Sequence, residues 1–164
     1  MSGPLRALLA VTAALATLAV VWVLGMRRKD SVVVDLQRRV NRRLLNPRTM
    51  ATAGRPGAEA AVVRHTGRRS GRAYETPVDV VATGDGFLVG LVYGPRTDWA
   101  RNVLAAGAAV VVHEGEEHAV DSPRLVPLES VAEHFPRAAL RAMKAFGVTQ
   151  CLRVERADAA VTGT

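Results

Sequence analysis

The chain has 164 residues, of which 49% are hydrophobic, 23% charged and 4% aromatic. This length fits one compact domain with an appendage, and the hydrophobic share excludes a disordered chain. The single cysteine, Cys151, excludes a disulfide scaffold and a cysteine-based zinc cluster. Residues 1–48 carry nine basic and two acidic residues, which accounts for the whole net charge of +7. The remainder is neutral, so we expect no nucleic-acid partner.

An uncharged apolar stretch, Ala7–Met26, lies between Arg6 and Arg27. As a helix it would span about 30 Å, the thickness of the hydrocarbon core of a bilayer. A cleaved signal sequence usually has an apolar region of about 7–15 residues followed by a small-residue cleavage site. This stretch is longer and ends in basic residues. We therefore predict a single-pass anchor over residues 1–29, with residues 5–26 in contact with membrane lipid.

The basic residues that follow the apolar stretch predict its orientation. The positive-inside rule places the domain after the anchor in the cytoplasm, at the cell membrane. Residues 30–57 are predicted to form a basic juxtamembrane helix and a linker. Apolar residues recur at helical spacing over Asp35–Asn46, and Pro47 ends this helix. An interfacial helix on anionic lipid and a solvated linker helix are both compatible with this pattern.

Residues 58–157 show short strands separated by turn signals, and residues 158–164 are predicted to be a flexible tail. Five or six strands and two helices favour a small closed antiparallel barrel, mainly β with flanking helices. The expected strands cover 59–66, 73–83, 87–93, 109–113, 117–128 and 150–155. The expected helices cover 99–106, with Asp98 as N-cap, and 129–146, interrupted near Pro136.

The strongest local feature is the basic loop Thr66–Arg72, with two glycines, three arginines and a serine. Glycines let the backbone approach a ligand, and guanidinium groups bind phosphate or carboxylate. A solvated basic turn is the alternative interpretation. The loop lacks the lysine and serine or threonine that end a Walker motif.

A second feature, Tyr93–Asn102, concentrates a phenol, an indole, arginines and an amide where a strand gives way to a helix. Each residue alone has an ordinary structural explanation, such as capping or packing. The segment His113–His118 matches no zinc spacing, so no metal is expected. His65 and His134 are interpreted as surface or hydrogen-bonded residues, and Cys151 as a buried thiol.

Several motifs in order resemble the deazaflavin-dependent nitroreductase family. They are His65–Arg72, Thr76-Pro77-Val78, Gly84–Val89, Tyr93-Gly94 and Asp98–Leu104, within about Val62–Val126. Members of this family use coenzyme F420 and include membrane-associated quinone reductases. The resemblance implies a split β-barrel, similar to flavin-binding barrels, here preceded by an N-terminal transmembrane helix.

The resemblance also implies a set of site residues. The phosphodiester and oligoglutamate tail of the coenzyme would lie on the basic loop, at Arg68, Arg69, Ser70, Gly71, Arg72 and Ala73. The deazaflavin ring would be edged by the backbone of Thr76, Pro77 and Val78, and lined on its other side by Leu91, Val92, Tyr93 and Gly94. From the short helix, the ring or tail would be contacted by Trp99, Arg101, Asn102 and Val103.

These expectations define an oxidoreductase that transfers hydride from reduced F420 to a quinone or a similar small apolar acceptor. The cofactor supplies the chemistry, and Tyr93 is the candidate catalytic residue, donating a proton or hydrogen bond to the acceptor. Two alternatives remain open: an FMN-dependent oxidoreductase of the same barrel type, and a non-catalytic membrane-tethered protein that binds a cofactor or lipid. Small barrels often bury a face by dimerising, so a homodimer is a further expectation.

Overall fold

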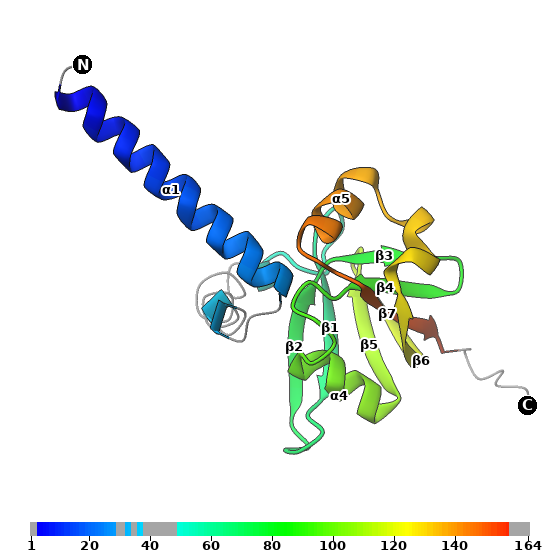
Figure 1. Cartoon of the computed structure of the whole chain (residues 1–164). Coiled ribbons are helices and arrows are strands. Elements are labelled where there is room, and N and C mark those ends of the chain that lie inside the picture. Colours follow the sequence, from blue (N-terminus) through cyan, green and yellow to red (C-terminus); the bar gives the residue numbers. More distant parts are fainter. Residues whose placement is uncertain (1–2, 29–31, 34–35, 38–48, 158–164) are drawn as a thin grey trace, which may run out of the picture.

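A curled antiparallel sheet forms the body of the protein, and one long helix projects from it in the computed structural model (Figure 1). The structure describes residues 3–28, 32–33, 36–37 and 49–157. The helix, α1 (Gly3–Arg28), contains the predicted stretch Ala7–Met26 and leaves most of it exposed. Its length and composition suit a membrane span, and a signal sequence would meet the same criteria. The predicted helix over Asp35–Asn46 falls mostly outside the described residues.

Seven strands make up the sheet, and neighbouring strands are antiparallel. They are β1 (Ala61–Thr66), β2 (Ala73–Val78), β3 (Val80–Ala82), β4 (Gly86–Gly90), β5 (Ala108–His113), β6 (Glu116–Pro127) and β7 (Gln150–Arg156). Their order in space is β2-β1-β5-β6-β7-β4-β3. The edge strands β2 and β3 are separated along the chain by Asp79 alone. Because a single residue links the two edges, the sheet must curl until they meet, which produces a half-barrel.

This topology confirms the predicted split β-barrel with flanking helices and corrects the strand count. The sequence pattern predicted one strand over 73–83, whereas the structure ends β2 at Val78 and starts β3 at Val80. Apolar and β-branched residues continue across Asp79, so local propensity gives no break there. The break comes from closure of the sheet, because β2 pairs with β1 and β3 pairs with β4 at the opposite edge.

Two apolar clusters fill the two faces of the sheet. Along β4, Phe87 and Val89 enter the first cluster, and Leu88, between them, enters the second. Along β7, Leu152 joins the first cluster and Cys151 the second. This alternation follows the two-residue period of strand side chains. The first cluster therefore fills the inside of the half-barrel, and the second lies between the sheet and the outer helices. Cys151 is confirmed as a buried thiol.

Three short helices complete the domain: α4 (Asp98–Ala106), the 3₁₀ helix η2 (Leu128–His134) and α5 (Arg137–Ala145). Helix α4 buries Ala100 and Val103 against the first cluster, while η2 and α5 cover the second. The predicted stop at Gly107 is confirmed, because this residue adopts a left-handed conformation (φ 72°). The N-cap is Thr97 instead of Asp98, which is the first helical residue.

Candidate functional site

The basic loop joins β1 to β2, and its backbone is closed by its own hydrogen bonds. Gly67 N donates to Arg72 O and Gly71 N donates to Gly67 O, both at 2.8 Å. Gly71 has φ 65°, a conformation that favours glycine. A Cβ on Gly67 would lie 2.5 Å from Ser70 Oγ and 2.6 Å from Tyr74 Cε2. The left-handed backbone favours glycine at position 71, and the close approach of the Ser70 and Tyr74 side chains favours it at position 67.

Arg68 turns away from solvent and ties the loop to the start of α4. Its Nη1 donates to Asn102 Oδ1 at 2.8 Å, and its Nη2 donates to Asp98 Oδ1 at 3.1 Å. The backbone N of Arg68 also donates to Asn102 Oδ1, at 3.2 Å. Only 17% of the Arg68 side chain is exposed. Arg68 thus links the basic loop to the first turns of α4 through its side chain.

His65 continues this network into β2. Since Asn102 Oδ1 faces the donors of Arg68, Asn102 Nδ2 donates to His65 Nδ1, at 3.2 Å. The neutral ring can then donate from Nε2 to Thr76 Oγ1, also at 3.2 Å. Burial lowers the pKa of His65 below its ordinary value, which favours this neutral form. His65 is therefore buried and hydrogen-bonded, one of the two interpretations given to it above.

Tyr74 supports the outer side of the loop. Its ring stacks on His65 with centroids 5.7 Å apart, and its hydroxyl lies 3.1 Å from Ser70 Oγ. Together with the contacts above, this links β1, β2, the loop and α4 into one hydrogen-bonded unit. The predicted residues that the unit brings together are Arg68, Ser70, Thr76 and Asn102.

Three other arginines of this region remain available to a ligand. Arg69 and Arg72 on the loop and Arg101 on α4 are exposed. None of the three forms a side-chain hydrogen bond or ion pair with another of the described residues. They surround a loop whose backbone is fixed, so little further ordering of the loop would be needed to bind an anion.

Several other predicted residues contribute mainly to the core. Leu91 and Val103 are almost fully buried in the first cluster, and Val92 packs against the second. Val78 and Trp99 are half-buried against the first cluster. Of these, Leu91 and Val103 would reach a ligand through their backbone atoms. Of the remaining predicted residues, Gly94 is buried, Pro77 and Tyr93 are partly exposed, and Gly71 and Ala73 are exposed.

The turn after β4 leads directly into α4. Gly94 N donates to Leu91 O at 2.8 Å, and Gly94 has φ 79° with open space where a Cβ would stand. The Thr97 hydroxyl, at the N-terminus of α4, is buried and has no hydrogen-bond partner among the described residues. An orphaned buried hydroxyl carries a free-energy cost that a ligand oxygen or water can offset.

The structural roles of Asp98, His65, Tyr74 and Thr97 were not apparent from the sequence pattern. For Asp98 the signal was ambiguous, because an acidic residue at a helix start is expected as a cap or as a dipole partner. Its contact with Arg68 spans 30 positions in the chain, a distance over which residue spacing carries no information. The His65–Tyr74 stack depends on the β1–β2 register, which pairs these two residues.

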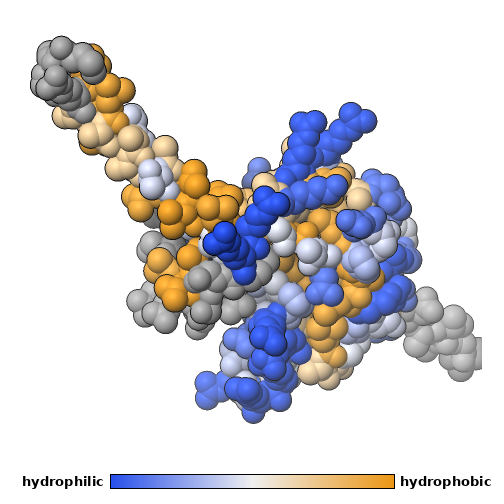
Figure 2. Space-filling model, in the orientation of Figure 1, coloured by the Kyte–Doolittle hydropathy of each residue, from blue (hydrophilic) through white to orange (hydrophobic). Residues whose placement is uncertain are grey.

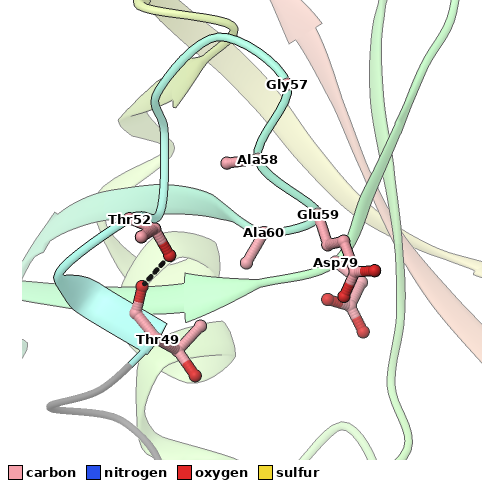
Figure 3. Close-up of a pocket in the computed structure, with 7 residues that line it drawn as sticks. All are labelled: Thr49, Thr52, Gly57, Ala58, Glu59, Ala60 and Asp79. Carbon is pink, nitrogen blue, oxygen red and sulfur yellow. Dashed lines mark hydrogen bonds between the residues drawn. The ribbon is translucent and has the colours of Figure 1, made fainter.

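A separate hollow of about 590 Å³ lies beside the segment that precedes β1 (Figure 3). Thr49 and Thr52 line one side, and Glu59 and Asp79 place their carboxyl groups together on the other. Burial raises the pKa of Asp79, and the like charge of Glu59 adds to this shift. This acidic lining is unsuited to an anionic coenzyme, so the arginine-rich loop remains the candidate site.

The structure is a curled half-barrel in which an arginine-rich loop is hydrogen-bonded to the start of α4. A family model described as F420H(2)-dependent quinone reductase matches residues 21–157, well over half of the chain. The chain therefore belongs to the F420H2-dependent quinone reductase family, and the resemblance seen in its motifs is confirmed. It is a member of a family of F420-dependent reductases.

Structural similarity to solved proteins is modest. An F420-H2 dependent reductase, FDR-A, is 16% identical with a TM-score of 0.46, covering 59% of this chain and 94% of that one. A structure described as a domain-swapped dimer is 18% identical with a TM-score of 0.47, covering 74% and 98%. The heme storage protein HutZ from Vibrio cholerae is 11% identical with a TM-score of 0.44, covering 61% and 82%. Among curated proteins, no match was found.

Proposed function

We propose that this chain is a membrane-anchored reductase that passes hydride from reduced F420 to a quinone or a similar small apolar acceptor. The observation that carries the proposal is the pairing of a rigid loop with exposed arginines. Arg68 is committed to Asp98 and Asn102, while Arg69, Arg72 and Arg101 are left facing solvent around it. This division suits a site that must hold a polyanion without reorganising.

The donor set fits the negatively charged tail of the coenzyme. Phosphodiester and glutamate groups would be held by Arg69, Arg72 and Arg101, with amides of the Gly67–Arg72 loop as further donors. The orphaned Thr97 hydroxyl offers one more polar partner beside α4. Backbone atoms of Thr76–Val78 and of Leu91–Gly94 would hold the edges of the ring. When bound, the reduced coenzyme supplies a hydride from carbon 5.

Tyr93 is the proposed catalytic residue of the chain. Its side chain is half-buried in the turn between β4 and α4. A phenol there can donate its proton, or a hydrogen bond, to an acceptor oxygen that gains negative charge during reduction. The half-buried Trp99 and Val78 provide apolar walls, which favour a small apolar acceptor and exclude water.

The proposed anchor is α1, retained in the mature protein, with the domain in the cytoplasm. The apolar surface of α1 is exposed along most of its length and is not part of either core cluster, and Arg27 and Arg28 lie in its last turn. A lipid-soluble acceptor would then be available at the bilayer to which the domain is attached. Flotation with membranes after alkaline extraction, with an intact N-terminus by mass spectrometry, tests this part. A protein released into solution without its first residues would contradict it.

Titration of the purified protein with F420, followed by the fluorescence of the coenzyme, tests the site. We expect saturable binding and about a three- to tenfold loss of affinity for Arg69→Ala and for Arg72→Ala, because each removes an exposed charge-assisted contact. Both variants should melt like the wild type. Arg124→Ala, which removes an exposed arginine of β6, is the control and should bind F420 normally.

Further variants separate structure from chemistry. Arg68→Ala should lower both affinity and melting temperature, since it releases the loop from α4. Tyr93→Phe should keep F420 affinity and slow quinone reduction. If the protein shows no saturable F420 binding, or if Arg69→Ala and Arg72→Ala together bind as well as the wild type, the proposed site is wrong.

A further inference from the structure

The C-terminal end of α1 packs against the domain beside α5. The rings of Trp22 and Phe146 meet edge to face with centroids 5.4 Å apart, and Met26 is 1% exposed. Gly147 has φ 64°, and a Cβ there would lie 2.9 Å from the carbonyl oxygen of Arg27. These contacts form a small joint between the last turns of α1 and the residues that follow α5, which places α5 beside α1 (Figure 1).

The joint fixes the height of α5 relative to a bilayer spanned by α1. Arg27 and Arg28 mark the polar end of the helix, and Trp22 lies about 8 Å further into the apolar stretch, at about 1.5 Å per residue. Phe146, which directly follows α5, contacts Trp22 at that level. The C-terminal end of α5 therefore stands near the depth of the lipid headgroups, where tryptophan side chains are enriched.

The exposed face of α5 is basic. Arg137, Arg141 and Lys144 fall within about 60° of arc at 100° per residue, opposite the buried Met143. α5 contains no acidic residue, and none of the three cations has a side-chain partner among the described residues. The acidic residue closest to α5 in the sequence is Glu133 of η2, and its Oε1 lies 3.9 Å from His134 Nε2. Figure 2 shows long hydrophilic side chains standing beside the lower end of α1.

We propose that this α5 face, Arg137, Arg141 and Lys144, docks on the anionic phospholipid headgroups of the bilayer that α1 spans. The domain as a whole is neutral from residue 49 onward, so this row of cations is a local feature and not a consequence of bulk charge. Cations within a Debye length of an anionic leaflet are attracted to it, and the joint brings α5 near enough for this attraction to favour the docked domain. The inference rests on the proposed anchoring by α1.

Full-length protein in vesicles tests the proposal. Ala138→Cys places a label on the exposed side of α5, while Cys151 stays unlabelled because burial raises its pKa to about 11. Energy transfer from this label to headgroup-labelled lipid is compared in phosphatidylcholine vesicles with and without phosphatidylglycerol. We expect higher transfer with the anionic lipid, and its loss in about 1 M salt, where the Debye length is about 3 Å.

Charge-matched variants supply the controls. Changing Arg137, Arg141 and Lys144 together to Gln should lower the ratio of docked to undocked domain about 100-fold, at about fivefold per cation. Changing Arg64, Arg96 and Arg124 to Gln removes the same charge elsewhere and should leave the transfer unchanged.

The outcomes separate the anchor from the docking face. If every variant floats with the vesicles but the energy transfer does not depend on lipid charge or on the α5 substitutions, the docking proposal alone is wrong. The docking proposal is also wrong if this face of α5 binds an acidic protein instead of lipid. Loss of flotation would overturn the anchor and the docking together.

Discussion

Asn102 is the residue on which the site geometry depends most, because its amide joins β1, the basic loop and α4 in one hydrogen-bonded network. It accepts from Arg68 N at 3.2 Å and from Arg68 Nη1 at 2.8 Å, and it donates to His65 Nδ1 at 3.2 Å. Its side chain is buried, with 6% exposed. Asn102→Ala would leave His65 Nδ1 without its partner and the Arg68 guanidinium with Asp98 only.

The expected cost is about 2–3 kcal/mol in the free energy of unfolding, because a buried group left without a partner costs about 1–3 kcal/mol and the bond to a charged group adds to it. For a domain of this size that is a fall of about 10 °C or more in melting temperature. Thermal and urea unfolding followed by circular dichroism measure it, and F420 affinity should fall in parallel.

The neighbouring Arg101→Ala is the matched control, because Arg101 is exposed on the same helix. It should change stability by no more than about 0.5 kcal/mol. If Asn102→Ala unfolds at the wild-type temperature and denaturant concentration, the inferred network does not hold the loop, and the site as described here is wrong.

Two further predictions concern the half-barrel and its buried histidine. Gly86→Ala should destabilise the protein by about 3 kcal/mol or more, since its Cβ would stand 2.0 Å from Val154 O; Gly84→Ala, where the space is open, should unfold like the wild type. Because burial lowers the pKa of His65, the unfolded chain binds a proton first as pH falls. Stability should therefore decline below about pH 6.5, by up to about 1.4 kcal/mol per pH unit until the folded pKa is reached. His65→Gln should remove this pH dependence, which unfolding curves of both proteins at several pH values measure. If the free energy of unfolding depends on pH equally in both proteins, the reasoning is wrong.

The strands and helices were largely predictable because their signals are local. Short apolar runs bounded by turn signals predicted β4 and β5, an apolar stretch near the C-terminus predicted β7, and Gly107 predicted the end of α4. The break at Asp79 was not predictable, since it follows from pairing with strands at opposite edges of the sheet. By contrast, the interruption expected near Pro136 within residues 129–146 is observed: the structure has η2 before this proline and α5 after it.

For the site, composition identified the basic loop and the polar segment that begins α4, but not the division of roles among the arginines. Arg68, Arg69 and Arg72 are equivalent in the sequence, with the same charge in the same loop. In the structure Arg68 binds Asp98 and Asn102, whereas Arg69 and Arg72 stay exposed. Predicting this would have required the position of α4 relative to β1.

The sequence by itself determined the apolar helix, the mainly β domain, the glycines of the loop and the family, because each of these depends on residue type and short-range spacing. Tertiary structure decided which side chains became partners. The curl of the sheet and the packing of α4 set contacts such as Arg68–Asp98, and the joint at Gly147 set the height of α5 beside α1. These contacts join residues far apart in the chain, and their geometry exists only once the core has packed.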